Sequence, residues 1–264
     1  MNHASIVIPV FNQLHFTKKC LETLLADTSR PAYEVIVIDN GSSDGTKEFL
    51  LSEADRLLSS GSKDKIIPII NETNRGVAPA WNQGCEKSTG EYIAVLNNDI
   101  LLSEGWFTAL VDVMKKFKLA LVSPFAGTGE LSYNFEGKAR SFTSKNKNAL
   151  WASYDFCAVV MKQSTFKELG PFDEKYLVGG YEDTDYAYRM KAKKLRYAVS
   201  GAAYIHHFGS QTLGEFKKRG DKHADHNKKY FMEKWGEDPS RFAGTWRGKV
   251  LKSWRRFKLR FEKM

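Results

Sequence analysis

The sequence predicts an α/β fold in which a Rossmann-like, mostly parallel sheet is flanked by helices. Up to about residue 100, short apolar segments alternate with amphipathic segments of about 10 to 15 residues. This alternation indicates βαβ units, because parallel strands are joined by helical crossovers. Three of the apolar segments also end in polar residues, near positions 12, 39 and 97. Buried parallel strands end in this way at the ligand-binding edge of a sheet.

The period of the apolar residues assigns the elements in order. In the first part of the chain, strands are expected at residues 5–10, 34–38, 65–70 and 92–96, and helices at 14–26, 45–59 and 78–87. Beyond residue 99 the pattern is less regular. Helices are expected there at residues 104–116 and 181–193, and strands at 120–123, 151–161 and 197–206. The polar segment 127–147, which contains Gly and Ser, is expected to be a long loop.

The length and the charge distribution predict one large domain followed by a basic extension. The 264 residues are 42% hydrophobic and 27% charged, which is ordinary for a soluble globular protein. Residues 1–213 carry 24 Lys and Arg against 24 Asp and Glu, whereas residues 214–264 carry 16 against 7. We therefore expect a domain at residues 1–213, with halves at 1–100 and 101–213, and a basic helical extension at 214–264.

The cysteines and the hydropathy pattern favour a cytoplasmic protein. Cys20, Cys85 and Cys157 are widely spaced and odd in number. They form neither a disulfide framework nor a Cys-x-x-Cys metal pair, which favours a reducing compartment. No stretch reaches the roughly 18 apolar residues of a membrane-spanning helix. The strand-like segment that begins at Ser5 leaves no room for a signal peptide, so we expect none.

Residues at the ends of the first two expected strands indicate a nucleotide site. The turn Pro9-Val10-Phe11-Asn12 can present backbone amides and an aromatic face to a flat base. Asp39 can accept hydrogen bonds from a base or a ribose. The turn at residues 40–46 matches neither G-x-G-x-x-G nor a P-loop, which disfavours a dehydrogenase and a P-loop enzyme. Taken alone, these residues are equally consistent with Pro9 ending a strand and Asp39 starting a turn.

Asp99 is the candidate metal ligand. It ends the string Asn97-Asn98-Asp99, which follows the fourth expected strand. A carboxylate there can hold a hard divalent cation that neutralises a departing diphosphate, although a helix N-cap is the alternative explanation. His206 and His207 follow an apolar run of a later strand, where adjacent side chains point to opposite faces. At most one of the two histidines can therefore face the metal.

Three acidic residues begin the helix expected at 181–193, after two glycines. The helix dipole favours acidic residues in a first turn, so capping explains two of the three. The third is expected to face a cleft, where a carboxylate can act as a general base on an acceptor hydroxyl. The three residues are Glu182, Asp183 and Asp185.

In this order, the motifs resemble those of family 2 inverting glycosyltransferases, and in particular a bacterial rhamnosyltransferase-like branch. The resemblance covers about residues 5–212 and implies a glycosyltransferase A-type fold. It rests on residues 9–12, 37–46, 74–78, 82–84, 96–99, 170–174, 181–185, 189 and 206–207. The first half of the domain would bind the nucleotide, and the second would hold the acceptor and the catalytic residues.

The resemblance implies a role for each matching residue. The nucleoside would be held by Pro9, Phe11, Asn12, Asp39 and Arg75, and the ribose and diphosphate would face Asn97 and Asn98. The metal, Mg or Mn, would bind Asp99 and His206, and the base would be Asp183. The sugar and the acceptor would be surrounded by Trp151, Asp155, Tyr181 and Glu182. Many relatives have Asp-x-Asp where this chain has Asn-Asn-Asp, so the site has one negative charge fewer, which predicts weaker metal binding.

The implied reaction is a metal-dependent, inverting transfer of the hexosyltransferase type. Asp183 would remove the proton of an acceptor hydroxyl, which attacks the anomeric carbon opposite the nucleotide. The donor would be a UDP- or dTDP-sugar, with dTDP-rhamnose among the candidates, and the acceptor a glycan or lipid-linked hydroxyl in surface polysaccharide synthesis. A nucleotidyltransferase is the alternative, but it would not need Glu182, Asp183 and His206. Intact Asp99 and Asp183 disfavour a non-catalytic sugar-nucleotide-binding protein.

The end of the chain, at residues 246–264, predicts attachment to a membrane surface. It holds eight Lys or Arg residues and one acidic residue. The apolar residues Trp246, Val250, Trp254, Phe257 and Phe261 fall at helical spacing. This pattern is typical of an interfacial helix on an anionic membrane, and it predicts a peripheral protein at the inner face of the cell membrane. A helix packed on the domain is the alternative, and nucleic acid is disfavoured because no nucleic-acid motif accompanies the charge.

Overall fold

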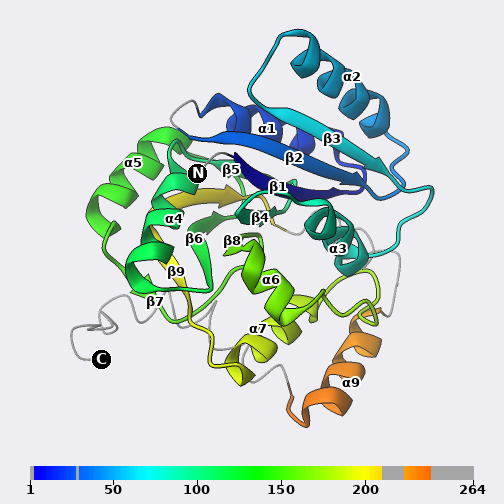
Figure 1. Cartoon of the computed structure of the whole chain (residues 1–264), viewed down its shortest axis with the longest axis vertical. Coiled ribbons are helices and arrows are strands. Elements are labelled where there is room, and N and C mark those ends of the chain that lie inside the picture. The colour runs from blue at the N-terminus through cyan, green and yellow to red at the C-terminus, as the bar shows by residue number, and fades with distance from the viewer. Residues whose placement is uncertain (1–2, 28–29, 210–222, 239–264) are drawn as a thin grey trace.

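The structure is a computed structural model that describes residues 3–27, 30–209 and 223–238. Its strands form one sheet that carries helices on both faces (Figure 1). One face is covered by α1 (Leu14–Ala26), α2 (Thr46–Ser59) and α4 (Trp106–Phe117). The other is covered by α3 (Val77–Lys87), α6 (Gln163–Leu169) and α7 (Glu182–Ala192). The predicted α/β class is confirmed.

The N-terminal half of the sheet is parallel, as predicted. Its strands, in the order β3-β2-β1-β4, are β1 (His3–Val10), β2 (Ala32–Asp39), β3 (Lys65–Ile70) and β4 (Tyr92–Leu96). The central three are apolar runs buried on both faces, which suits strands covered by two layers of helices. The chain moves from β1 toward β2 and β3, and then returns to place β4 on the other side of β1. Open α/β sheets bind ligands at such a switch in strand order.

Beyond β4 the sheet is mixed. β8 (Ala158–Lys162) pairs antiparallel with β4, and β6 (Leu121–Thr128) pairs antiparallel with β8. β9 (Tyr197–His207) runs parallel to β6. Two short strands pair antiparallel with β9, namely β5 (Ile100–Leu102) and β7 (Leu150–Trp151). The β5–β9 pairing brings the end of β9 next to the polar string that follows β4.

The segment expected to be a long loop contains α5 (Phe135–Asn146). Asn134 caps this helix, because its Oδ1 accepts a hydrogen bond of 2.6 Å from the backbone nitrogen of Gly137. Phe135 and Phe142 lie on its inner face and pack against Tyr204 of β9. Gly and Ser residues obscured the helical period, and the prediction of a loop at residues 127–147 is wrong for this part.

The strand expected at residues 151–161 is interrupted. β7 ends at Trp151 and β8 begins at Ala158, and a turn separates them. Asp155 holds this turn: its Oδ1 accepts a hydrogen bond of 3.1 Å from the nitrogen of Cys157. Such side-chain hydrogen bonds compete with strand pairing and favour turns. The turn places Asp155 at the same edge of the sheet as the end of β4.

Helix α3 approaches the sheet closely because Gly84 faces β1. A Cβ atom at Gly84 would lie 2.3 Å from Cγ1 of Val7, so no larger residue fits without a shift of the helix. The close approach buries Trp81 against Phe156 and Phe172, with ring centroids 5.9 and 4.9 Å apart. The ring of Trp81 is thereby fixed at the edge of the sheet.

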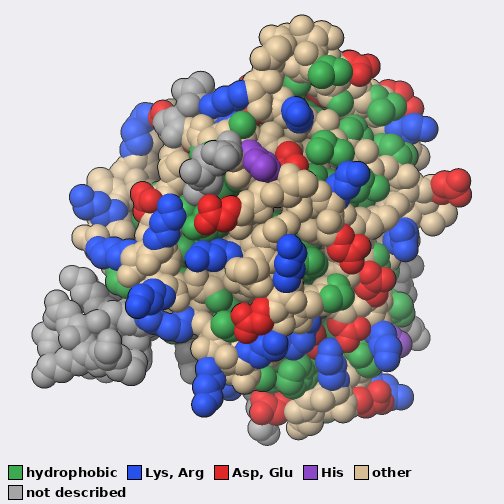
Figure 2. Space-filling model, viewed as in Figure 1, with side chains coloured by type: hydrophobic (Ala, Val, Ile, Leu, Met, Phe, Trp, Pro, Cys, Tyr) green, Lys and Arg blue, Asp and Glu red, His purple; other side chains and the backbone are tan. Residues whose placement is uncertain are grey.

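Helix α9 (His223–Trp235) belongs to the predicted extension at residues 214–264, yet it packs on the domain beside α7 (Figure 1). Fully buried Phe231 contacts Tyr188 of α7, with ring centroids 5.1 Å apart. The predicted amphipathic segment 246–264 lies outside the described residues. In the described ranges, no helix has the length and apolar character needed to cross a membrane. Acidic and basic side chains are interspersed over the face that Figure 2 shows.

Candidate functional site

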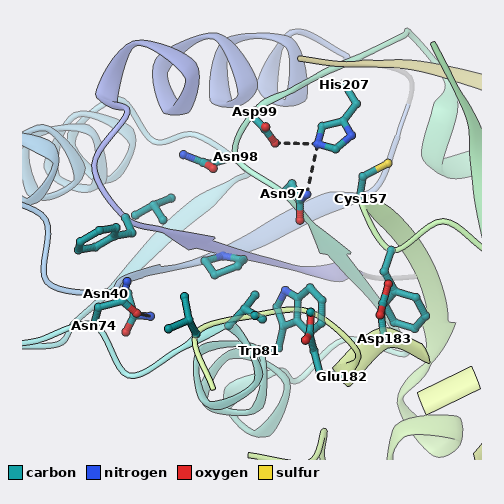
Figure 3. Close-up of a pocket in the computed structure, with 18 of the residues that line it drawn as sticks. Asn40, Asn74, Trp81, Asn97, Asn98, Asp99, Cys157, Glu182, Asp183 and His207 are labelled. Atoms are coloured by element: carbon teal, nitrogen blue, oxygen red, sulfur yellow. Dashed lines mark hydrogen bonds and ion pairs between the residues drawn. The ribbon is translucent and has the colours of Figure 1, made fainter. Parts of the chain in front are cut away.

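A pocket of about 260 Å³ opens where β1, β2 and β4 end. The start of α7, the loop before it and Trp81 of α3 form its other walls (Figure 3). Polar residues that follow separate strands therefore meet at one edge of the sheet, as expected for parallel strands. The predicted site residues that line the pocket are Pro9, Phe11, Asn97, Asn98, Asp99, Asp155, Glu182 and Asp183.

Asn40 lines the pocket just after β2, and sequence reasoning missed it. Its Nδ2 donates hydrogen bonds to Oδ1 of Asn74 at 2.9 Å and to the carbonyl of Gly76 at 3.1 Å. Its Oδ1 accepts hydrogen bonds from Nδ2 of Asn71 and from the nitrogen of Arg75. Asn40 therefore joins the end of β2 to the segment before α3. Its position directly after the strand was the available signal.

The predicted residues Asp39, Asn12 and Arg75 do not line the pocket. Oδ1 of buried Asp39 accepts a hydrogen bond of 2.9 Å from the nitrogen of Ser42. Oδ1 of Asn12 accepts one of 2.8 Å from the nitrogen of Ser43. Both side chains thus shape the turn after β2, next to the pocket. Arg75 is exposed.

Asp99 and His207 form a pair at one side of the pocket. Nε2 of His207 lies 3.1 Å from Oδ1 of Asp99 and 3.4 Å from Nδ2 of Asn97 (Figure 3). The pairing of β5 with β9 sets this contact, because Ile100, the residue after Asp99, lies opposite His207. Nδ2 of Asn98 points instead to Oγ1 of Thr17 of α1, at 3.0 Å.

The structure places His207, and not the predicted His206, beside Asp99. Nδ1 of His206 lies 2.6 Å from the hydroxyl of Tyr133, and its Nε2 lies 2.9 Å from the carbonyl of Gly129. The two ring nitrogens therefore both have partners on the other face of β9. Alternation along the strand predicted that only one histidine faces the site, but the register of β9 against β5 selects which one.

The chemistry of the Asp99–His207 pair fits a divalent cation. A carboxylate and an imidazole are ligands that Mn²⁺ accepts, and Mg²⁺ is commonly held by one carboxylate plus phosphate oxygens. Among the described residues, no group of three or more His, Cys, Asp or Glu side chains could hold a metal. The pair therefore suits an ion that takes its remaining ligands from a bound diphosphate and from water.

Glu182 and Asp183 lie in the first turn of α7, across the pocket from Asp99 (Figure 3). Burial raises the pKa of the Asp183 carboxyl above its ordinary value, and the charge of Asp155 adds to this rise, while hydrogen bonds from Thr184 oppose it. Burial raises the pKa of Glu182 as well, and the charge of Asp183 contributes. A carboxylate with a raised pKa is a stronger base, so Asp183 is suited to accept a proton.

Trp81 and Glu182 offer two unused polar atoms to the pocket. Within the part of the chain that the structure describes, Nε1 of Trp81 and Oε2 of Glu182 are buried and have no hydrogen-bond partner. Buried polar atoms are normally paired, so an indole donor and a carboxylate acceptor are both available to a ligand. Sequence reasoning identified Glu182 but missed Trp81, which shows there only as an apolar residue of an expected helix.

Residues 5–170 match the sequence model of the family described as Glycosyl transferase family 2. This stretch includes the residues that follow β1, β2 and β4 and line the pocket. The chain belongs to glycosyltransferase family 2. The matched stretch ends before Glu182 and Asp183, which lie on the other side of the pocket.

This member of family 2 is similar to the glycosyltransferase AglE of Haloferax volcanii, with 29% identity over 184 residues. The match covers 67% of this chain but only 58% of AglE, so the chain spans little more than half the length of that relative.

Two solved structures show the glycosyltransferase A-type fold. GalNAc-T7, solved with UDP, GalNAc and Mn²⁺, aligns with a TM-score of 0.63 and 16% identity over 78% of this chain and 44% of that chain. The mannosyltransferase PcManGT from Pyrobaculum calidifontis, in complex with GDP-Man and Mn²⁺, aligns with a TM-score of 0.62 and 16% identity. This second alignment covers 87% of this chain and 64% of PcManGT.

Three further residues singled out in the sequence of this glycosyltransferase do not line the pocket. Fully buried Asp185 accepts hydrogen bonds from Nε of Arg189 at 3.0 Å and from Nε1 of Trp235 at 2.8 Å. Trp151 packs against a phenylalanine of β6, with ring centroids 5.5 Å apart. Tyr181 precedes α7, and its ring centroid lies 6.0 Å from that of a phenylalanine of α9. Asp185 is thus a structural member of the acidic group.

Proposed function

We propose that this family 2 enzyme transfers a sugar from a nucleoside-diphosphate sugar to a hydroxyl group, with inversion of the anomeric configuration. The observation that carries the proposal is the arrangement of the pocket. The Asp99–His207 pair lies on one side, and Asp183, a carboxyl with a raised pKa, lies on the other. An anionic leaving group and a proton acceptor can therefore occupy opposite sides of a sugar bound between them.

Asp99 and His207 would hold Mg²⁺ or Mn²⁺ together with the diphosphate of the donor. When bound, the cation supplies positive charge that stabilises the departing nucleoside diphosphate. The Mn²⁺ in the GalNAc-T7 and PcManGT structures supports this assignment. Asn97 carries no charge where many relatives have the first Asp of Asp-x-Asp, so we expect the cation to bind mainly with the donor.

The nucleoside would bind where Pro9 and Phe11 follow β1 and where Asn40 and Asn74 form a hydrogen-bonded pair. Phe11 offers an aromatic face, and Asn40 lies at the end of the neighbouring strand. Asn12 and Asp39 would shape this part of the pocket through the turn they hold, and Arg75 would lie at its rim. The proposed donors are UDP- and dTDP-sugars, with dTDP-rhamnose among them.

The sugar would lie between Trp81, Glu182 and Asp155. Trp81 Nε1 would donate a hydrogen bond to a sugar hydroxyl, and Glu182 Oε2 would accept one, so both buried atoms would gain partners. Asp183 would take the proton of the attacking hydroxyl. The new bond from oxygen to the anomeric carbon would form as the bond to the diphosphate breaks, and the diphosphate would leave with the electron pair.

The acceptor would be a glycan or a lipid-linked hydroxyl that enters on the Asp183 side. Its entry there would leave the nucleotide on the opposite face of the sugar, which is the geometry of a single displacement. A nucleotidyltransferase would use the nucleotide side of the pocket alone, and the family match and the position of Asp183 favour sugar transfer over it.

The test measures release of nucleoside diphosphate from a panel of UDP-, dTDP- and GDP-sugars with MnCl₂ or MgCl₂. We expect one donor to be hydrolysed slowly with water as acceptor, and transfer to accelerate with a suitable glycan. Asp183→Asn keeps the shape of the side chain but removes its basicity, so kcat should fall by about 10² or more while donor binding persists. Asp112→Asn, an exposed change on α4, is the matched control. Normal turnover of Asp183→Asn would remove Asp183 from the role of base.

A further inference from the structure

Asn227 of helix α9 forms hydrogen bonds with the backbone of the loop that leads into α7. Asn227 of α9 is fully buried. Its Nδ2 donates hydrogen bonds to the carbonyls of Leu177 at 2.9 Å, Gly180 at 3.0 Å and Gly179 at 3.2 Å. Its Oδ1 accepts a hydrogen bond of 2.8 Å from the nitrogen of Leu177. Every one of these partners is a backbone atom of the loop 177–180, so the side chain fixes the path of that loop.

The loop 177–180 forms a wall of the pocket and has an unfavourable backbone conformation. Val178, Gly179 and Gly180 line the pocket. The φ angles are +55° at Val178, +102° at Gly180 and +78° at Tyr181. A β-branched valine in the left-handed region is strained and persists only where surrounding contacts hold it. Asn227 supplies such contacts from α9. From α3, the nitrogen of Val77 donates a hydrogen bond of 2.8 Å to the carbonyl of Val178.

The C-terminal end of α9 holds the chain just after Asp183. Nε1 of Trp235 lies 2.8 Å and Nζ of Lys234 lies 2.7 Å from Oδ1 of Asp185. Asp183 therefore lies between two contacts with the same helix, the backbone of Leu177–Gly180 before it and the side chain of Asp185 after it. A displacement of α9 would be transmitted to both.

We infer that Asn227 is a positioning residue for the sugar transfer. It holds the backbone of the loop 177–180, in which Val178 and Gly180 have positive φ angles, and thereby sets the place of Asp183 and of the pocket wall. This inference rests on the proposed role of Asp183 as base. Misplacement of a catalytic group by about 1 Å can cost on the order of 10²-fold in rate, so a residue that touches no substrate can still control kcat.

A general role in docking α9 would make a different prediction. Other residues also dock the helix: Tyr230 donates a hydrogen bond of 2.9 Å to Oδ2 of Asp173, and Phe231 is buried against α7. Tyr230 and Phe231 make these contacts with Asp173 and α7, whereas Asn227 contacts the backbone of the loop that lines the pocket. Tyr230→Phe removes one docking hydrogen bond without touching the loop, so it is the matched control for Asn227→Ala.

The experiment uses the full chain with three variants, Asn227→Ala, Asn227→Asp and Tyr230→Phe. Asn227→Asp keeps the shape and the acceptor for the Leu177 nitrogen but loses the three donated hydrogen bonds. Three quantities are measured: amide hydrogen exchange of peptides covering residues 177–183, the Kd values of UDP, dTDP and GDP with MnCl₂, and kcat for nucleoside diphosphate release. For both Asn227 variants we expect exchange to rise by about 10-fold or more and kcat to fall by about 10-fold or more, with Kd within about 3-fold of the wild-type value. Tyr230→Phe should leave all three near the wild-type values.

Unchanged exchange at residues 177–183 in both Asn227 variants would overturn the inference, as would faster exchange with an unchanged kcat. An equal loss of kcat in Tyr230→Phe would show that general docking of α9 is responsible, which also overturns it. If Asn227→Ala does not fold, Asn227→Asp carries the test. The proposed function is refuted by a different result, namely that the wild-type protein releases no nucleoside diphosphate from any donor. In that case the exchange measurement still reports whether Asn227 holds the loop.

Discussion

Single residues give the pocket two chemically different sides, one with the Asp99–His207 pair and one with Glu182 and Asp183. The Asp99–His207 contact of 3.1 Å is the residue-level feature on which the metal assignment depends. Since both side chains belong to the pocket wall, neither needs to move far to bind an ion that arrives with a nucleotide.

We predict that Mn²⁺ strengthens nucleoside diphosphate binding only when this pair is intact. Asp99→Ala should abolish the effect of MnCl₂ on the affinity for UDP, dTDP or GDP measured by calorimetry, and His207→Ala should reduce it, because each variant removes one ligand. His206→Gln is the control. This variant should leave the effect of MnCl₂ unchanged, because His206 faces Tyr133 and not Asp99. A normal metal effect in Asp99→Ala would exclude Asp99 as a ligand.

The indole nitrogen of Trp81 provides a second prediction at the level of one residue. Trp81→Phe keeps an aromatic ring packed on Phe172 but removes the unpaired N–H. The KM for the donor sugar should rise roughly 3- to 10-fold, the cost of one hydrogen bond, while the affinity for the free nucleoside diphosphate stays the same. Trp106→Phe is the matched control, because Nε1 of Trp106 is also buried without a described partner but belongs to the core on the other face. An equal change in both variants would refute the contact with the sugar.

At the level of elements, the first turn of α7 gathers two carboxyls whose pKa values are raised by burial. A raised pKa in the folded state means that ionisation disfavours folding, so stability is lost as pH rises through the interval between the unfolded and folded pKa values. The same burial that makes Asp183 a stronger base therefore lowers the stability of the enzyme at neutral pH.

We predict that Asp183→Asn raises the thermal unfolding temperature at about pH 7.5, because the amide carries no charge to desolvate. The gain should shrink toward about pH 4, where an unfolded aspartate begins to be protonated. Thermal unfolding of wild-type protein and Asp183→Asn across this pH range tests the prediction. Asp112→Asn, which changes an exposed carboxylate, should show no such dependence. A variant that is less stable than wild type at neutral pH would contradict it.

The elements also show how far the sequence can be interpreted and why. The strands and helices before residue 100 follow from their periods, because the apolar runs of β1, β2 and β4 are buried on both faces and the helices bury apolar residues against the sheet. Helix α5 was missed because Gly and Ser residues dilute a helical period that only Phe135, Ala139 and Phe142 carry among its buried residues. The same holds for the residues of the site. Asp99 and Asp183 can be predicted from local sequence patterns, whereas the choice of His207 over His206 depends on the register between strands. The places of Asn40 and Trp81 in the pocket depend on tertiary contacts.

For the whole molecule, the charge distribution separates a balanced domain from a basic chain end. Residues 1–213 have equal numbers of acidic and basic residues, and both signs are interspersed on the surface in Figure 2. The excess of positive charge therefore lies in residues 214–264, and half of its Lys and Arg residues fall within 246–264.

We predict that the full-length protein sediments with phosphatidylglycerol vesicles at low salt and is released by added salt. Each Lys or Arg near an anionic surface contributes about 1 kcal/mol, and this attraction is screened by ions. A chain that ends at Gly244 should keep nucleotide binding and lose sedimentation, and neutral phosphatidylcholine vesicles are the matched control. If the full-length protein stays in the supernatant with anionic vesicles, the interfacial helix is refuted and a tail packed on the domain is favoured.

The strand pairing that joins Asp99 to His207 also bears on how the enzyme is made. Asn97 and His207 touch although 110 positions separate them in the chain. When Asp99 emerges from the ribosome, the ends of β1, β2 and β4 have already been made, whereas the start of α7 and His207 emerge about a hundred residues later. Contacts of such separation form late, because the intervening chain must first be ordered. A nascent chain consequently passes through a stage in which the parallel half of the sheet is complete but the first turn of α7 and His207 are still missing, so all walls of the pocket are present only after residue 207 has emerged.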